Sequence, residues 1–420
     1  MATKIKILAP VGSFESLAAA VQAGADAIYF GVEQLNMRVK SAGAFTIDDI
    51  ATVATKCDEH NIRKYLTLNT TVYDYDKNLF TEIITASKEA GVDAIIASDF
   101  AVIMECRRQG MPVHISTQTN VSNLDSVKFF STFADLIVLS RELTLKQVEA
   151  ITHGIERHDV RGPSGELVKI EIFGHGALCM AISGKCYLSL HSNNSSANRG
   201  ACIQNCRHKY TVIDQDSQQE LEIDNEYIMS AKDLCTIDIL DKIAATGISV
   251  LKIEGRGRTA DYVFETVRVY KEALAAIDEG AYTAENIARW RKELATVFNR
   301  GFWEGYYLGR KLGEWNETDG SKATQKKVYL AQGVRYYPKL KVAEFKLESG
   351  KLKVGDEVLV IGPVTGIVRQ VVETIHVDNG PVEIVKQGFN FTIPFSAHIR
   401  PTDKLYKLIP TEYADADPLP

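Results

Sequence analysis

Short apolar runs and longer amphipathic stretches alternate through the first 255 residues of the chain. Eight runs have the near-continuous apolar character of parallel strands that are buried on both faces: 5–9, 27–30, 65–68, 94–97, 114–116, 136–139, 170–173 and 250–253. Six stretches between them carry apolar residues every three or four positions, as helices do: 13–23, 47–60, 79–90, 100–109, 122–133 and 145–152. Eight such units predict an α/β fold, a (β/α)8 TIM-like barrel over residues 1–310, with a doubly wound open sheet as its rival.

A long insertion, about residues 174–249, separates the seventh apolar run from the eighth. Within it we expect a hairpin over 211–224 and a helix over 237–244. Helices are expected again over 261–277 and 284–299, before an aromatic and glycine-rich turn at 299–306. Because active sites of such barrels lie at the carboxyl ends of the strands, this insertion should cover the mouth of the barrel.

The pattern changes after residue 310. Residues 311–325 are polar and predict a linker, and 326–410 alternate short strand-like runs with Asn-Gly and Gly-Pro turns. Runs at 351–358, 367–377 and 391–393 predict a small C-terminal antiparallel β-barrel. Residues 411–420 are acidic, end in proline, and are expected to form a frayed tail.

Charge divides the chain in the same place. The net charge of the 420 residues is −6, but residues 322–410 hold 14 Lys and Arg against 8 Asp and Glu, whereas residues 1–321 hold 34 against 43. The C-terminal module is therefore either a contact for a polyanion such as RNA or an ordinary solvated surface. The N-terminus has no leader-like pattern and no apolar run is long enough to span a bilayer, so we expect a cytoplasmic protein.

Four of the seven cysteines lie close together in the insertion, and a fifth follows. The four are Cys179, Cys186, Cys202 and Cys206, and the fifth is Cys235. Four thiolates suit tetrahedral zinc or an iron–sulfur cluster, and the six residues between the first two favour a cluster over a zinc knuckle. Cys235 is a candidate substitute ligand. Cys57 and Cys106 lie in helical patterns and are read as buried apolar residues.

Polar and charged residues follow the predicted strands and would surround the mouth. Arginines there suit carboxylate or phosphate oxygens, and Glu254 and His175 are the candidates for proton transfer. Lys252 faces either the barrel or the outside, and Arg258 is either a ligand group or a surface cation. A nucleophilic cysteine paired with His175 is the competing chemistry. The remaining candidate binding residues are Arg38, Asn69, Gln118, Arg141 and Arg256.

Several blocks resemble one known family. They are 171–179 (EIFGHGALC), 183–189 (SGKCYLS), 199–210 (RGACIQNCRHKY), 230–234 (SAKDL), 251–256 (LKIEGR) and 300–305 (RGFWEG). In these blocks the chain is similar to the collagenase-like peptidase family of unassigned catalytic type. The likeness covers almost the whole chain and is strongest to the members that take part in prephenate-dependent hydroxylation of transfer-RNA uridine.

The resemblance implies a function that the residues alone do not give. It implies oxygen-independent hydroxylation of the tRNA wobble uridine to 5-hydroxyuridine, with a 4Fe–4S cluster on Cys179, Cys186, Cys202 and Cys206 and with prephenate as a co-substrate. In that interpretation His175, Glu254 and Arg141 are catalytic, and Arg256 and Lys252 bind the anion. The family name implies the alternative of a peptidase. A third interpretation is a zinc-stabilised assembly factor without catalytic activity. A homo-oligomer or a complex with a paralogue is a further expectation.

Overall fold

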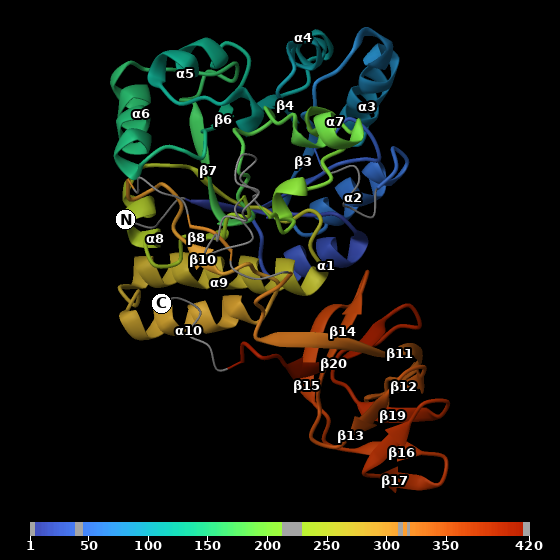
Figure 1. Ribbon diagram of the computed structural model, residues 1–420. Coiled ribbons are helices and arrows are strands. Elements are labelled where there is room, and N and C mark those ends of the chain that lie inside the picture. The colour runs from blue at the N-terminus through green and yellow to red at the C-terminus, as the bar shows by residue number, and fades with distance from the viewer. Residues whose placement is uncertain (1–4, 38–44, 212–228, 310–313, 317–319, 415–420) are drawn as a thin grey trace.

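The wall of the barrel consists of eight parallel strands that close on themselves (Figure 1). The computed structural model of the chain describes residues 5–37, 45–211, 229–309, 314–316 and 320–414. Strands β1 to β7 pair in chain order, and β9 pairs with both β7 and β1, which closes the ring and confirms the predicted (β/α)8 barrel. The eight strands are β1 (Lys6–Pro10), β2 (Ala27–Phe30), β3 (Arg63–Leu68), β4 (Ala94–Ala97), β5 (Val113–Ile115), β6 (Leu136–Val138), β7 (Lys169–Gly176) and β9 (Val250–Ile253).

Helices follow the strands and cover the outside of the barrel. Side chains cap several of them: Asp99 accepts from the amide of Ala101 at the start of α4, and Thr144 forms the expected capping box with Gln147. The barrel helices are α1 (Phe14–Gln22), α2 (Asp49–Asp58), α3 (Lys77–Glu89), α4 (Phe100–Gln109), α5 (Leu124–Phe130), α6 (Leu145–Arg157), α8 (Leu240–Ala245), α9 (Ala260–Glu279) and α10 (Ala284–Ala295). No helix within the described ranges has the length and apolar character needed to cross a bilayer.

The insertion between β7 and β9 is mostly irregular and carries short helical turns. These are α7 (Leu188–Asn193), η3 (Ala197–Arg199) and η4 (Asn205–Arg207), followed by the strand β8 (Asp233–Cys235). β8 runs antiparallel to the end of β7, with His175 opposite Cys235. The helix expected over 237–244 is α8, and the hairpin expected over 211–224 lies outside the described residues, apart from residue 211.

The segment after α10 packs back on the insertion. The expected helix over 284–299 ends at Ala295, and part of the expected turn forms a short strand, β10 (Phe302–Trp303), beside β8. In the predicted linker, Trp315 bridges to Ala231 and the Lys232 ammonium lies 3.0 Å from a Glu314 carboxylate oxygen. The described part of that linker therefore holds the entry to β8 in place.

Antiparallel sheets form the C-terminal part of the chain, as predicted, around a core that includes Phe345, Phe391 and Phe395. The expected run 351–358 splits into two strands because Gly355, with φ of 87°, makes a turn between them. The strands are β11 (Gln325–Tyr337), β12 (Val342–Leu347), β13 (Lys351–Lys353), β14 (Glu357–Gly362), β15 (Gly366–Val371), β16 (Ile375–Val377), β17 (Gly380–Val382), β18 (Ile384–Lys386), β19 (Asn390–Pro394) and β20 (Lys404–Pro410).

These sheets dock on the barrel under α1 and α9 (Figure 1). An apolar cluster that includes Ala19, Ala260 and Ile367 lies between them. The Gln22 side chain donates to the carbonyl of Ile367 at 2.7 Å and accepts from the Ile367 amide at 2.8 Å, so it pairs with β15 as a strand would. The C-terminal sheets are thus fixed to the outside of the barrel.

Candidate functional site

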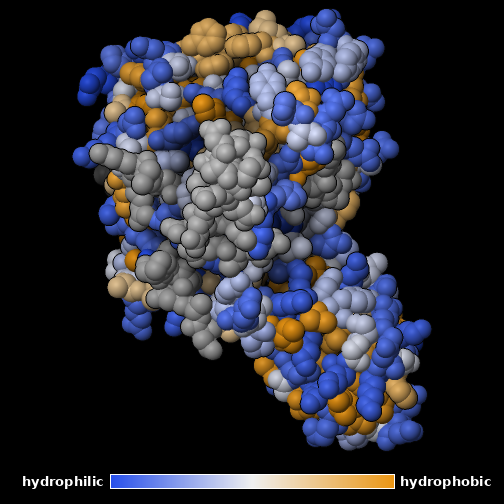
Figure 2. Space-filling model, viewed as in Figure 1, coloured by the Kyte–Doolittle hydropathy of each residue, from blue (hydrophilic) through white to orange (hydrophobic). Residues whose placement is uncertain are grey.

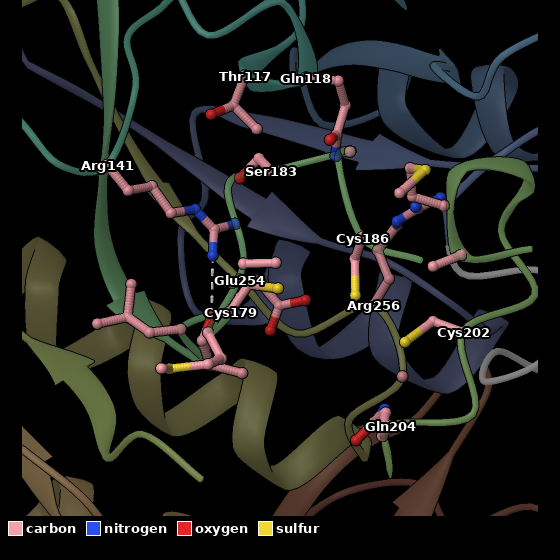
Figure 3. A pocket seen from close by; sticks show the side chains of 18 of the residues that line it. Thr117, Gln118, Arg141, Cys179, Ser183, Cys186, Cys202, Gln204, Glu254 and Arg256 are labelled. Carbon is pink, nitrogen blue, oxygen red and sulfur yellow. Dashed lines mark hydrogen bonds between the residues drawn. The ribbon is translucent and has the colours of Figure 1, made fainter. Parts of the chain in front are cut away.

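A cavity of about 470 Å³ lies at the carboxyl ends of the barrel strands, under the cysteine-rich insertion (Figure 3). Its floor is lined by side chains of the strands and of the loops that follow them, and its cover comes from the insertion. The barrel contributes Tyr29, Thr67, Asn69, Gln118, Arg141, Phe173, Lys252, Glu254 and Arg256. The volume falls within the range of sites for small molecules.

All four clustered cysteines line this cavity. Cys179 is exposed, and Cys186, Cys202 and Cys206 are half-buried. Figure 3 shows Cys186 and Cys202 on the side of the cavity opposite Arg141. Burial raises the pKa of the Cys206 thiol, the adjacent Arg207 lowers it, and the thiolates of the other three raise it further. The four sulfurs therefore share one electrostatic environment, although residues 179 and 206 are far apart in the chain.

Arg207 ties the cysteine segments together. Its guanidinium donates to the carbonyl of Leu178 at 2.5 Å, to the carbonyl of Ala231 at 2.5 Å and to the hydroxyl of Ser230 at 3.0 Å. Leu178 precedes Cys179, and Arg207 follows Cys206. One side chain thus links the first and last clustered cysteines to the entry of β8.

Two further contacts fix the insertion over the barrel mouth. Arg199 forms a bidentate pair with the largely buried Asp76, at 2.7 and 3.2 Å, and its guanidinium lies 4.2 Å from the ring centroid of Tyr73. The Arg199 side chain lowers the pKa of the Asp76 carboxyl. The Asn120 amide donates to the carbonyl of Ser183 at 3.2 Å. The cover of the cavity is therefore attached to the loops after β3 and β5.

Cys235 and the four clustered cysteines do not share one place in the structure. Across the described ranges, no three His, Cys, Asp or Glu side chains are arranged to hold a single metal ion. Zinc would need four ligands within about 2.3 Å of one point. Cys235 lies outside the cavity, in the core, where it accepts a hydrogen bond from Tyr270 at 3.8 Å and burial raises its pKa to about 12. Its place on β8, paired with β7, keeps it from the other four.

Positive charge dominates the rest of the cavity lining. Among the described lining residues, the cations are Arg141, Arg207, Lys252, Arg256, Arg258 and Arg300, and the carboxylate is Glu254. Burial lowers the pKa of Arg258 and of Arg300, and the two share the buried carboxylate of Asp233, at 4.0 and 3.4 Å. Such an excess of guanidinium groups in a recess attracts an anion.

The Lys252 side chain faces into the barrel rather than outward, the two orientations that the sequence allowed. Its ammonium lies 2.8 Å from Glu171 Oε1, and both side chains are buried. It also lies 4.4 Å from the ring centroid of Tyr29. Burial lowers the pKa of Lys252, Glu171 raises it, and Arg256 and Arg141 lower it again. The floor of the cavity therefore carries the Lys252 ammonium, which pairs with the buried carboxylate of Glu171.

Arg141 and Arg256 flank this lysine. The Arg141 guanidinium stacks 3.8 Å from the ring centroid of Phe173 and donates to the carbonyl of Ala177 at 3.1 Å (Figure 3). Arg256 donates to Thr67 at 2.6 Å and to Asn36 at 3.0 Å. A Cβ at Gly31 would lie 2.5 Å from the Arg256 guanidinium, so glycine is needed there to admit it.

The side chains of Glu254 and His175 are not brought together, although the Glu254 amide donates to the His175 carbonyl at 2.8 Å. Glu254 lines the cavity, whereas His175 is 1% exposed and enclosed by the rings of Tyr262, Tyr270 and Phe302 at 5.5–6.0 Å. Burial lowers the pKa of His175 to about 3. The cause is an irregularity in the β7–β9 register between Phe173 and His175, which turns the histidine away from the side that Phe173 lines.

The other predicted binding residues have distinct surroundings. Asn69 and Gln118 line the cavity, and the Asn69 amide donates to Ser116 at 3.2 Å. Arg38 lies outside the described residues. Sequence reasoning missed Arg207, Arg300 and Asn198 as lining residues. Arg207 had a signal, since it directly follows Cys206 in one of the family-like blocks, whereas Asn198 had none.

The family model for peptidase family U32 matches residues 12–317 of the chain. The chain is a member of peptidase family U32. The match spans the barrel and the whole cysteine-rich insertion, and it agrees with the resemblance read from the sequence blocks.

Relatives within and around the U32 family carry two kinds of name. A protein of Porphyromonas gingivalis (strain W83) named "Collagenase" is 52% identical over 402 residues, covering 96% of this chain and 97% of its own. The "tRNA hydroxylation protein P1" of Bacillus subtilis is 31% identical over 407 residues, covering 91% of each chain. A 23S rRNA 5-hydroxycytidine synthase of Escherichia coli is 30% identical over 326 residues, covering 76% of this chain and 47% of its own. Similarity over most of this chain thus links this U32 member to both groups.

Proposed function

We propose that this U32 protein hydroxylates an RNA base without molecular oxygen, most specifically a tRNA wobble uridine to 5-hydroxyuridine. The observation that carries the proposal is the cavity itself, which has four thiols on its cover and a buried cationic floor. Relatives named for tRNA and rRNA hydroxylation, at 29–31% identity, support the choice of RNA.

Four thiolates suit a 4Fe–4S cluster, and the six residues between Cys179 and Cys186 favour it over a zinc knuckle. A polynuclear cluster keeps its thiolate ligands further apart than one ion does, because iron and sulfide lie between them. All four thiols line the same cavity, so one cluster would lie within reach of each of them. Cys179, Cys186, Cys202 and Cys206 would hold the cluster, which when bound supplies one-electron redox chemistry.

The cationic floor suits a small dianion. Arg141 and Arg256 are each fixed by contacts to neighbouring groups, and Lys252 lies between them on the floor. A molecule with two carboxylates, such as prephenate, would bind between the guanidinium groups and be oriented by them. Glu254 is the carboxylate among the described lining residues and would accept or return a proton there.

The C-terminal sheets supply positive charge for a long polyanion. Lys351 and Lys386 lie directly opposite each other on β13 and β18, and both are exposed. Like charges in such a cross-strand pair repel unless a partner neutralises them. Phosphate groups of RNA would do so, with an affinity that falls as salt rises.

The test is anaerobic purification followed by iron and sulfide analysis and anaerobic incubation with unmodified tRNA and prephenate. We expect bound iron and sulfide, a broad visible absorption, and one added oxygen atom on uridine by nucleoside mass spectrometry. A colourless protein that binds one zinc ion would refute the cluster, and iron-loaded protein that leaves RNA unchanged would refute the activity.

A peptidase is the second candidate because of the relatives named "Collagenase". All nine histidines of the chain lie within the described residues, and none of them lines the cavity. A cysteine–histidine pair is therefore missing from it, and Glu254 is the single carboxylate among the described lining residues, so they form no carboxylate dyad. Hydrolysis of gelatin by metal-free protein, abolished in Cys179→Ala, would support the peptidase instead.

A further inference from the structure

A second, smaller chamber adjoins the cavity. Its volume is about 200 Å³, and it shares five lining residues with the main cavity: Met37, Asn69, Gln118, Gly184 and Asn198. The rest of its lining comes from the loops after β3 and β4 and from the insertion, and includes Thr71, Ser98, Phe100 and Lys185. A group bound in this chamber would therefore touch whatever lies in the main cavity.

The chamber is polar but carries little net charge, in contrast to the main cavity. Its charged side chains, within the described part of the chain, are Asp99 and Lys185. Both Asp99 oxygens already accept backbone amides, from Val72 at 3.1 Å and from Ala101 at 2.9 Å. Lys185 is exposed at the surface. The inner surface thus suits a neutral group that forms hydrogen bonds.

Two side-chain amides are unused where the chambers meet. Gln118 Oε1 and Asn198 Oδ1 are buried and accept no hydrogen bond from a described residue. Leaving such an acceptor unpaired costs free energy, which a ligand that donates to it would recover. Each amide also carries an NH₂ group, so each side chain offers a donor as well as an acceptor to a ligand.

An aromatic ring borders the chamber. Phe100 is 56% exposed, and its ring stacks on Phe130 at 6.3 Å between centroids with planes 15° apart. Met104 of α4 and Phe129 of α5 are exposed as well, and Figure 2 shows apolar surface along its upper edge, where Figure 1 places these two helices. The ring is therefore braced on one face and leaves area for a second flat partner.

We propose that the smaller chamber binds one nucleobase of a single-stranded RNA, read by Gln118 and Asn198 and stacked against Phe100. A flat, neutral group with donors and acceptors along one edge is what two free amides and an aromatic ring recognise. The space suits one base. Lys185 at the rim would meet the phosphate of the same nucleotide. This proposal rests on the RNA-modifying function and adds to it the site that holds and selects the base.

The first test compares two phenylalanines of one aromatic cluster. Phe100→Ala removes the ring beside the chamber, whereas Phe129→Ala removes a ring that is 53% exposed and packs on the same Phe130, at 5.1 Å, but does not line the chamber. Stacking on an aromatic ring contributes enough that its loss weakens binding about tenfold. We expect this tenfold weaker binding for Phe100→Ala and not for Phe129→Ala. Fluorescence anisotropy with a labelled uridine hexanucleotide measures the affinity, and the two variants should have equal melting temperatures.

The second test measures base preference. Asn198→Asp keeps the shape but replaces the NH₂ donor by an acceptor, so it should disfavour uridine, whose edge offers two carbonyls, relative to cytidine, which offers an amino donor. We expect the ratio of uridine to cytidine hexanucleotide affinity to fall about tenfold. A purely structural role of Asn198 would weaken both oligonucleotides equally and leave the ratio unchanged.

The outcomes separate this proposal from the function on which it rests. If the wild-type protein hydroxylates and binds RNA, but Phe100→Ala matches Phe129→Ala and the ratio is unchanged, the base site is wrong and the function stands. If wild-type protein neither binds nor modifies RNA, both fail. Displacement of the hexanucleotide by a peptide rich in asparagine and glutamine, but not by free uridine, would also overturn the base site.

Discussion

Replacing Lys252 by methionine tests whether the cationic floor depends on a buried ion pair. Methionine keeps the length and apolar stem of lysine but removes the ammonium that lies 2.8 Å from Glu171 Oε1. Glu171 is fully buried, and its Oε2 accepts no hydrogen bond from a described residue. The substitution therefore leaves a carboxylate in the barrel without its cation.

The expected loss of stability follows from that orphaned charge. Removing one partner of a buried ion pair costs about 3–5 kcal/mol. For a barrel of this size, each kcal/mol corresponds to about 2 °C in melting temperature, so Lys252→Met should melt about 6–10 °C lower. Adding Glu171→Gln removes the charge, and the double variant should regain most of that loss.

Calorimetry and titration with prephenate provide the assay. Both the single and the double variant lack the Lys252 ammonium, so both should bind prephenate at least about tenfold more weakly. Only the single variant should have a lowered melting temperature. Glu171→Gln alone is the matched control for the buried carboxylate. A Lys252→Met protein that melts with the wild type, or a double variant that binds prephenate normally, would refute the ion-pair account.

Three other predictions follow from the same site. Cys206→Ser should lower the iron and sulfide bound after anaerobic reconstitution, whereas Cys235→Ser, in the core, should load as the wild type does; equal loss in both would contradict the ligand assignment. Arg207→Ala removes three charge-assisted hydrogen bonds, so its free energy of unfolding should fall by about 2–4 kcal/mol and it should bind less iron. Thermal melting and iron analysis measure both effects, and Arg161→Ala, at an exposed position, is the control. Because the pKa of Lys252 is lowered, prephenate affinity should fall as pH rises through that lowered pKa, below the 10.5 of free lysine, and a flat profile would count against it.

The strands and helices of the barrel could be predicted from the sequence because burial on both faces leaves little ambiguity. The expected run 94–97 is β4, and the expected helix 100–109 is α4, with Asp99 and Gly110 as its caps. Charged residues directly after such strands, including Arg141 and Glu254, had to reach the mouth of the barrel, and they line its cavity. Local patterns and a closed topology were sufficient for these features.

Features that depend on a single irregularity could not be predicted. His175 is two residues after Phe173, a spacing that normally places two side chains on the same face of a strand. The register irregularity in β7 instead directs the His175 side chain into a group of aromatic rings. Antiparallel pairing of β8 with β7 takes Cys235 into the core, although only 27 residues lie between it and Arg207 in the chain. The smaller chamber forms where the loops after β2, β3, β4 and β5 meet the insertion, and no local sequence pattern predicts that these segments approach one another.

One measurement tests the central claim most directly: mass spectrometry of tRNA nucleosides from a strain that lacks this chain and other U32 members, complemented with plasmid copies. The account predicts that the wild-type copy and Cys235→Ser restore a uridine carrying one extra oxygen atom, and that Cys206→Ser does not. Hydroxylated uridine at the same level in every strain, or restoration by Cys206→Ser, would contradict it.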